Sequence, residues 1–412
     1  MGRVVVTGLG AVSPLGIGVP ALWDGLVAGR SGVRRVQHFD TENLPVKIAA
    51  EVPDFDPKQF MDAKAARRMD RFAQFAIAAT REALGDAGLE VTDENRERIA
   101  IVVNTGGGGI PSIESNVTAM AVSGPNRVGP LVIPMFAPNM ASSQVSIAFG
   151  ILGPTITSAA ACASGVQAYV DAVRLLHSGE ADVVITGGTE AGITPVALTS
   201  LSHMQALSHR NDDPQAASRP FDADRDGFVF GEGAGILILE TEEHAVRRGA
   251  RVYAEAMGGA LTSDAFHLTA PEPTGRGARA AMTNALKRAE MSPEDIDYIA
   301  AHATSTPLGD TVETRAIKGA LGDHAANVAV SANKSMVGHM LGAAGAISAI
   351  SSVLAIRDSV VPPTINLQTP DPECDLNYVP NVAERRQVDA AMVNGFGFGG
   401  QNASTIFRRF QG

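Results

Sequence analysis

Short runs of apolar and β-branched residues recur along the chain, and longer stretches with helical spacing of apolar residues separate them. The runs are Val4 to Val6, Ile99 to Val103, Thr155 to Ser158, Asp182 to Ile185, Ile236 to Leu239, Val252 to Ala256, Ile296 to Ala300, Val328 to Ser331, Met392 to Gly395 and Ser404 to Arg408. Runs that are apolar throughout are typical of strands buried on both faces. Such strands, alternating with helices, predict an α/β layered fold with largely parallel strands.

The pattern also points to an internal duplication. The segments SAAACASGVQAYVDAVRLL from Ser158 and SANKSMVGHMLGAAGAISAISSVL from Ser331 both run from a strand through a polar turn into a helix of small apolar residues. Ala-rich helices resemble each other in any case, so the pattern leaves duplication and coincidence open. No low-complexity linker is present, so we expect one compact unit, with residues 1–250 as the N-terminal half and 251–412 as the C-terminal half.

Composition and charge exclude several classes of protein. The 412 residues are 45% hydrophobic and 19% charged, as in a globular chain and unlike a disordered or fibrous one. The formal net charge of -11 argues against nucleic acid as the main partner, because phosphate binding needs a basic surface. An acidic partner must therefore meet a local basic patch.

Cysteine usage and hydropathy predict a soluble, cytoplasmic protein. Only Cys162 and Cys374 are present, too few for a disulfide framework. The amino terminus, MGRVVVTGLGAVSPLG, has one basic residue and a glycine-broken apolar run, unlike a secretory signal. No uninterrupted apolar stretch reaches the roughly 20 residues that a bilayer requires, so we expect no membrane association.

Cys162 is a candidate nucleophile. It lies in AAACASG, directly after a predicted strand and at the start of a predicted helix. The positive end of a helix dipole favours a thiolate and so predicts a lowered pKa. A lone cysteine is also commonly a small buried apolar residue, and this segment alone leaves both interpretations open.

Two of the nine histidines have settings that suit chemistry. His302 lies in IAAHATSTPLGD at the end of a predicted strand, and His339 lies in SANKSMVGHMLGAAGA beside the second small-residue helix. Cysteine chemistry needs a proton donor or acceptor, which can be distant in sequence. For either histidine alone, a capping or core role is the favoured interpretation. Close-spaced ligand pairs such as CxxC or HxxxH are missing, so no metal or cofactor is predicted.

The motifs taken together resemble those of the elongating, type II β-ketoacyl-acyl carrier protein synthases of the thiolase-like superfamily. VVVTGLG, ACASG, SRPFDADRDGFVFGEGAG, AHATSTPLGD, NKSMVGHMLGAAGA and FGFGGQN occur in that family's order and spacing, over essentially the whole chain. The resemblance implies a thiolase-like fold, with two duplicated βαβαβαββ halves in a five-layered α-β-α-β-α arrangement. It also implies a homodimer.

The resemblance assigns roles to the candidate residues. Cys162 would take the acyl chain from acyl carrier protein as a thioester. Neutral His302 and His339 would assist decarboxylation of malonyl-acyl carrier protein, and Lys334 would set the local electrostatics. The product would be a 3-oxoacyl-acyl carrier protein, as in fatty acid elongation. The backbone amides of Cys162 and Phe398 would form the oxyanion hole, with the Phe398 ring as a gate to the acyl pocket.

Further residues are implied in binding. The phosphopantetheine arm and acyl chain would meet Thr304, Thr306, Thr269, His267, Gly107 and Leu201. The acidic carrier protein would meet Lys64, Arg67, Arg68 and Arg127. In MDAKAARRMDRF, Lys64, Arg67, Arg68 and Arg71 recur at helical spacing and predict one basic helix face. Without the resemblance, a solvated helix face would explain the same pattern.

Several positions depart from the family pattern. Ser348 stands where many members carry a glutamate, so Lys334 must find another acceptor, and Asp310 or Glu313 could pair with it. Gly107 replaces an isoleucine common in medium-chain enzymes, which predicts acceptance of acyl chains longer than about twelve carbons. Leu201 and Gln205 replace a phenylalanine and an arginine, with no clear expectation.

Three other functions compete with this reading. A thiolase needs a second cysteine in the glycine-rich carboxy-terminal motif, and Cys374 lies outside FGFGGQN. A ketosynthase of a polyketide pathway shares all three catalytic residues and stays an alternative. A catalytically silent chain-length partner subunit normally lacks the nucleophile, which Cys162 supplies here.

Overall fold

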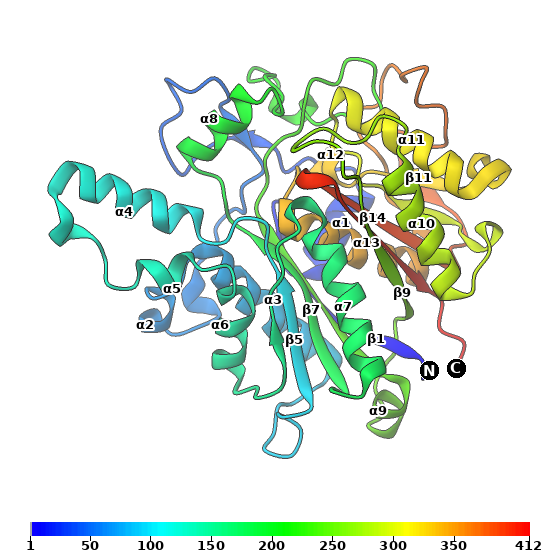
Figure 1. Ribbon diagram of the computed structural model, residues 1–412, viewed down its shortest axis with the longest axis horizontal. Helices are drawn as coiled ribbons and strands as arrows, with labels where there is room; N and C mark the ends of the chain where they lie inside the picture. The colour runs from blue at the N-terminus through cyan, green and yellow to red at the C-terminus, as the bar shows by residue number, and fades with distance from the viewer. Residues whose placement is uncertain (1) are drawn as a thin grey trace.

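The computed structural model describes residues 2–412 and contains a strand at each of the ten predicted runs (Figure 1). These strands are β1 (Val4–Ser13), β5 (Ile99–Asn104), β6 (Thr155–Ile156), β7 (Val183–Glu190), β8 (Gly233–Thr241), β9 (Ala254–Ser263), β10 (Tyr298–Ala300), β11 (Ala329–Ser331), β14 (Ala390–Gly397) and β15 (Gln401–Arg408). Two-residue strands complete the set: β2 (Gly16–Ile17), β3 (Arg34–Arg35), β4 (Ile48–Ala49), β12 (Val360–Val361) and β13 (Glu384–Arg385).

The strand order repeats. The five predicted strands of the first half lie in the order β6-β5-β7-β8-β1, and the five of the second half lie in the corresponding order β11-β10-β14-β15-β9. β5 pairs in parallel with β6 and β7, as β10 does with β11 and β14. β8 pairs antiparallel with β7 and β1, as β15 does with β14 and β9. Matching order and direction confirm the predicted duplication.

The expectation of largely parallel strands is wrong for half of each set. In each half three neighbouring strands run parallel, but the pairs made by β8 in the first half and by β15 in the second are antiparallel. In the second half the reason is a tight connection, since only Phe398–Gly400 separates β14 from β15. A parallel pair would need a crossover of a dozen or more residues.

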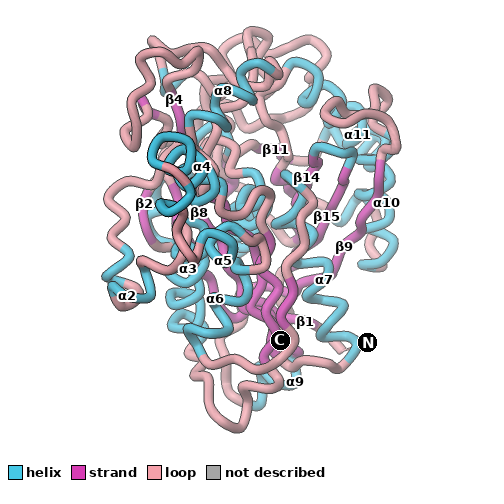
Figure 2. The backbone as a smooth tube through the Cα atoms, turned by 60° about the vertical axis from the view of Figure 1, so that its left-hand side comes forward, coloured by secondary structure: helices cyan, strands magenta, loops and turns pink. Residues whose placement is uncertain are grey.

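The two sets of strands meet at a short seam. There β1 and β9 pair antiparallel through Val5 with Glu255 and Val6 with Ala254, which joins both sets, with β2, into one 11-stranded sheet. Figure 2 shows how the strands of the two halves diverge from this seam and leave room between them.

Two buried helices fill the space between the halves. α7 (Ser164–Ser178) packs on β5 and β7 of the first half and on β9 and β15 of the second, and α13 (Ala344–Asp358) likewise packs on β8 and β14. Their amino ends cross closely, because a Cβ added to Gly165 would lie 2.8 Å from the carbonyl oxygen of Gly342. The segment Leu341–Asp358 is apolar and long enough to cross a membrane, but it is 83% buried as a core helix.

Helices also cover the two outer faces, which completes the predicted five layers. α3 (Arg71–Ala87) covers β1 and β8 and packs on α6 (Met140–Phe149), whereas α10 (Arg276–Ala289) covers β9 and β15 and packs on α11 (Pro307–Leu321). The other α-helices of the described residues are α1 (Val19–Val27), α2 (Ala63–Ala66), α4 (Ile110–Ser123), α5 (Val132–Phe136), α8 (Pro195–His203), α9 (Glu242–Arg247) and α12 (Lys334–Val337). Figure 1 shows α4 projecting away from the body.

Candidate active site

Cys162 lies on a strained turn at the amino end of α7. The turn Ala161–Ala163 is a short 3₁₀ segment, and Ala161 has φ 48°, in the left-handed region that costs a non-glycine residue about 1–3 kcal/mol. Ser164 holds the turn, because its Oγ accepts from Ala160 N–H at 2.8 Å and donates to the Ala161 carbonyl at 2.8 Å. Asn104 holds it from β5 by donating to the Ser164 carbonyl at 2.9 Å.

The duplicated half carries the same turn without the cysteine. The 3₁₀ segment Leu341–Ala343 precedes α13, and Leu341 has φ 39°. Gly342 therefore occupies the position that corresponds to Cys162. The strained backbone belongs to the repeat, and only one copy carries a thiol.

His302 is fixed through its backbone. It follows β10, and the Glu313 carboxylate of α11 accepts from the N–H groups of His302 at 2.8 Å and Ala303 at 2.6 Å. Asn394 of β14 donates to the same carboxylate at 3.2 Å. This clamp leaves the His302 imidazole nitrogens for a substrate.

His339 is buried next to His302. Its ring centroid lies 5.4 Å from that of His302, at an interplanar angle of 84°, and 5.1 Å from that of Phe228. Its backbone N–H donates to the Val229 carbonyl at 2.7 Å. Among residues 2–412 neither ring nitrogen of His339 has a hydrogen-bond partner, although the side chain is 1% exposed. Buried polar atoms without a partner require an explanation, and a bound substrate supplies one.

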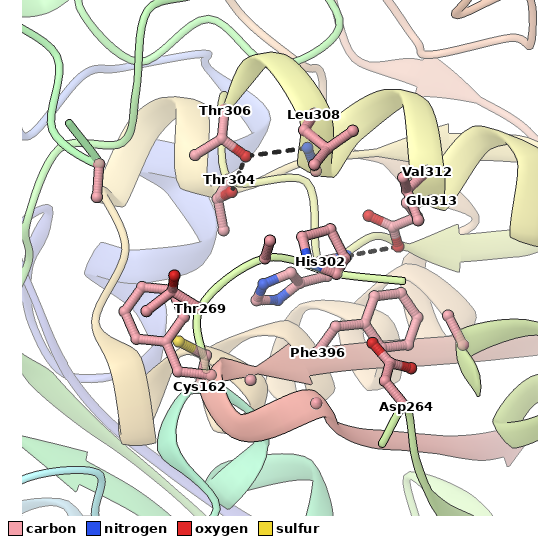
Figure 3. A pocket seen from close by; sticks show the side chains of 18 of the residues that line it. Cys162, Asp264, Thr269, His302, Thr304, Thr306, Leu308, Val312, Glu313 and Phe396 are labelled. Atoms are coloured by element: carbon pink, nitrogen blue, oxygen red, sulfur yellow. Dashed lines mark hydrogen bonds between the residues drawn. The ribbon is translucent and has the colours of Figure 1, made fainter. Parts of the chain in front are cut away.

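One cavity of about 370 Å³ brings the three candidate residues together. Figure 3 shows Cys162 and His302 directed into it, below the loop that carries Thr304 and Thr306. Its lining includes Cys162, His302, His339, Phe228, Phe396, Gly397, Phe398, Thr269, Thr304 and Thr306. Side chains from both halves thus meet in a space of the size that small-molecule sites have.

Comparison with protein-family models decides the family. Residues 1–245 match the model described as "Beta-ketoacyl synthase, N-terminal domain", and residues 253–368 match "Beta-ketoacyl synthase, C-terminal domain". The chain belongs to the β-ketoacyl synthase family. The resemblance drawn from the motifs is thereby confirmed.

Individual relatives agree with the family. The chain is 50% identical over 409 residues to a "3-oxoacyl-[acyl-carrier-protein] synthase 2" of Synechocystis sp. (strain ATCC 27184 / PCC 6803 / Kazusa), covering 99% of this chain and 98% of the relative. Among solved structures, "The ishigamide ketosynthase/chain length factor" is 37% identical with a TM-score of 0.93 over 100% of both chains. A type II polyketide ketosynthase in complex with its acyl-carrier protein is 33% identical with a TM-score of 0.92, over 99% of this chain and 100% of that one.

Burial dominates the acid–base state of this β-ketoacyl synthase site. Burial raises the pKa of the Cys162 thiol to about 11, while the backbone N–H of Phe398 and the Lys334 cation act in the opposite direction. The lowered pKa expected from the helix amino terminus is therefore wrong. Burial also lowers the pKa of His302 and of His339 well below 6.5, with Lys334 adding to both shifts, so both imidazoles are neutral at pH 7.

Lys334 lies buried in α12 and acts on the site through its charge. Burial lowers its pKa to about 8, and Glu313 is the first of the nearby groups that favour its cation, followed by Cys162 and Asp310. Ser348, buried on α13, donates instead to the Asn333 side chain at 3.3 Å. Of the two carboxylates that the sequence offered as partners, Asp310 and Glu313, Glu313 thus contributes more to stabilising the Lys334 cation.

The other predicted binding residues divide into two groups. Thr269, Thr304 and Thr306 line the cavity, whereas Gly107, Leu201 and His267 do not. His267 accepts from the N–H groups of Thr269 and Ala270, both at 3.1 Å, and so shapes the loop that presents Thr269. Gln205, with φ 57°, lines the cavity in place of Leu201.

The predicted basic helix is broken into two. α2 ends at Ala66 and α3 begins at Arg71, because the Asp70 side chain caps α3 by accepting from the Phe72 N–H. Arg71 turns inward and pairs with Glu232 at 2.8 Å, so it leaves the predicted basic face. The predicted carrier-binding side chains Lys64, Arg67, Arg68 and Arg127 are all exposed.

Some residues of the site escaped the sequence analysis. Phe228 packs edge-on against His339, and Phe396 packs against His302 at 5.6 Å between ring centroids. Phe228 lies in the quoted segment SRPFDADRDGFVFGEGAG, but aromatic residues beside glycines carry no signal of the histidine that they contact. Glu190, buried at the end of β7, also escaped, although a carboxylate closing an apolar strand was a visible signal.

Proposed function

We propose that this chain catalyses the decarboxylative Claisen condensation of an acyl-acyl carrier protein with malonyl-acyl carrier protein, as a 3-oxoacyl-acyl carrier protein synthase of fatty acid elongation. The observation that carries the proposal is the shared cavity of Cys162, His302 and His339, where both ring nitrogens of His339 are buried and find no partner in the described part of the chain, residues 2–412. Relatives about half identical over nearly the whole chain carry this activity in their names.

The first step is acyl transfer. The Cys162 sulfur attacks the acyl thioester carbonyl, the bond to the carrier's pantetheine sulfur breaks, and the thiol proton passes to that departing sulfur. The backbone N–H groups of Cys162 and Phe398 both act on the Cys162 sulfur. They are therefore placed to stabilise the oxyanion that forms on the carbon bound to it, each donor typically contributing about 10² to 10³ in rate.

The second step is decarboxylation and carbon–carbon bond formation. The malonyl carboxylate leaves as CO₂, and its electron pair becomes an enolate on the thioester oxygen. Neutral His302 and His339 each donate an N–H to that oxygen and stabilise the negative charge that develops on it. The enolate carbon attacks the Cys162 thioester, the C–S bond breaks, and the sulfur takes a proton from solvent. The product is a 3-oxoacyl thioester two carbons longer.

The proposed partner is an acyl carrier protein. Exposed Lys64, Arg67 and Arg68 form a local basic patch on a chain of net charge -11, which suits an acidic partner. A structural neighbour is described in complex with such a carrier. We also propose that the protein is cytoplasmic and that it forms a homodimer. Apolar side chains exposed on α4 and around α5 support the dimer, because such patches mark interfaces between proteins; they are Val117, Met120, Val122, Leu131 and Ile133.

A polyketide ketosynthase is the second candidate, because a solved ketosynthase of a type II polyketide synthase shares the fold. Sequence identity favours fatty acid elongation, at 50% against 33%.

Mass spectrometry tests the reaction class. Incubation with an acyl carrier protein charged with a saturated acyl chain should add that chain to Cys162, and malonyl-carrier should then remove it as 3-oxoacyl-carrier. Cys162→Ser serves as the control without a thiol. Failure to form the thioester, or a thioester that malonyl-carrier leaves in place, would refute the proposal.

A further inference from the structure

The Glu190 carboxylate is fully buried and holds four hydrogen bonds. It ends β7 and accepts from the N–H groups of Gly106 at 2.8 Å, Gly342 at 3.0 Å and Gly107 at 3.2 Å, and from the Thr105 hydroxyl at 3.2 Å. Burial raises its pKa to about 7, and these donors act against the rise. No step of the proposed reaction uses this carboxylate, so its hydrogen bonds need another explanation.

On one side Glu190 holds the turn that supports the nucleophile. The Ala161 and Thr105 carbonyls share the single proton of the Ser164 hydroxyl, at 2.8 and 3.3 Å, so this hydroxyl links Thr105 to the strained backbone at Ala161. Gly106 lies between the two copies of the turn, because a Cβ there would be 3.5 Å from both the Ala161 carbonyl oxygen and the Gly342 nitrogen. A shift of this turn is therefore passed to the backbone next to Cys162.

On the other side Glu190 holds the segment that carries His339. Gly342 follows His339 by three residues, and the His339 ring has no hydrogen-bond partner among residues 2–412. The backbone consequently decides where this imidazole lies. It is anchored at His339 by the Val229 carbonyl and at Gly342 by Glu190.

The duplication shows why this backbone N–H needs an anion. Gly342 corresponds to Cys162, and β7 holds the same place in its set of strands as β14, which leads to Phe398. In the catalytic copy the Cys162 N–H acts on the sulfur. In the other copy the corresponding N–H, that of Gly342, donates to the Glu190 carboxylate. The Glu190 carboxylate thus occupies, at Gly342, the position that corresponds to the oxyanion hole at Cys162.

We propose that Glu190 is a positioning residue, whose carboxylate ties the turn beneath Cys162 to the segment of His339 and so fixes the distance between the acylated sulfur and the enolate. The inference rests on the proposed function. Acylation needs the turn of Cys162 and the Phe398 N–H but neither histidine, and decarboxylation needs the histidines but not the thiol. Only carbon–carbon bond formation requires the acylated Cys162 sulfur and the histidines to be correctly placed relative to each other.

The coupling between CO₂ release and product formation tests the proposal. At pH 8 we expect Glu190→Gln, which puts an amide group among N–H donors, to lower 3-oxoacyl-carrier formation roughly tenfold to hundredfold, the penalty of a misplacement near 1 Å. Uncoupled enolate takes a proton from water, so CO₂ and acetyl-carrier should be released in excess over product. Thr105→Val, which removes one donor, should raise the same ratio by a smaller factor.

A matched control separates positioning from stability. Glu82→Gln changes another partly buried carboxylate, one that accepts from Ala11 and Val19 N–H on the outer face, and should leave the ratio unchanged. A ratio equal to that of the unmodified enzyme in both Glu190→Gln and Thr105→Val, with normal or reduced rates, would overturn the proposal. Absence of any 3-oxoacyl product from the unmodified enzyme would instead refute the proposed function.

Discussion

At the scale of single residues, burial sets the protonation of the reacting groups in opposite directions. It raises the pKa of the Cys162 thiol to about 11 and lowers the pKa of both imidazoles, so thiol and rings are all neutral near pH 7. The sequence motifs identified these three side chains, because Cys162 begins a predicted helix, His302 ends a predicted strand and His339 lies beside a predicted helix. They could not show the thiol's pKa, since burial depends on side chains from both halves that close over the sulfur.

Lys334 is predicted to keep the histidines neutral in mild acid. In Lys334→Met, loss of the cation should raise the pKa of His302 and of His339 toward 6.5. At a pH below the pKa, each unit by which the pKa rises lowers the fraction of neutral imidazole about tenfold. Malonyl decarboxylation should therefore decline at higher pH than in the unmodified enzyme. The rate measured from pH 5 to 8 checks this.

Lys318→Met provides the comparison, because Lys318 pairs with Asp375 on the surface at 2.7 Å. Its pH profile should superimpose on that of the unmodified enzyme. If the profile of Lys334→Met also superimposes, the lysine has no electrostatic role in the decarboxylation.

At the scale of elements, the apolar runs located the ten predicted strands but did not show which strands pair with each other or in which direction. Apolar runs report burial on both faces, whereas strand direction depends on the connections, and the three-residue link before β15 forces a hairpin. The broken basic helix was also predictable in part. Asp70 is a favoured N-cap residue, and an aspartate directly before a new apolar period marks a helix start.

The crossing of α7 and α13 is predicted to depend on glycine. In Gly165→Ala the new Cβ would lie 2.7 Å from the Ala346 nitrogen and 2.8 Å from the Gly342 oxygen, both backbone atoms, so the helices must separate. We expect destabilisation of about 1–3 kcal/mol, measured by denaturant unfolding. The exposed Gly85 of α3 has no atom within 4 Å of an added Cβ. Gly85→Ala should instead stabilise by about 0.5–1 kcal/mol, and equal effects at both positions would contradict the packing argument.

At the scale of the whole molecule, an acidic protein has to attract an acidic partner. The net charge of -11 repels such a partner at long range, so the exposed basic side chains near α2 must supply the local attraction. Net charge was readable from the sequence. The position of the patch relative to the cavity was not, because it depends on how the two halves assemble.

Charge reversal in this patch is predicted to weaken carrier binding selectively. Arg67→Glu should raise the KM for acyl-carrier roughly fivefold, the scale of an exposed ion pair, with kcat nearly unchanged. The effect should shrink as salt is added, because exposed charges are screened. Lys287→Glu, an equal charge change on the exposed side of α10, should leave KM unaltered. Equal changes for both variants would mean that Arg67 only contributes to the overall field.

The interleaving of the two central helices has a consequence for biosynthesis. α7 (Ser164–Ser178) is translated before β9 and β15, yet both of these strands form part of its packing surface. A nascent chain therefore carries this apolar helix partly uncovered until β15 has been synthesised. A product truncated before Gln401 lacks one of the surfaces that bury α7.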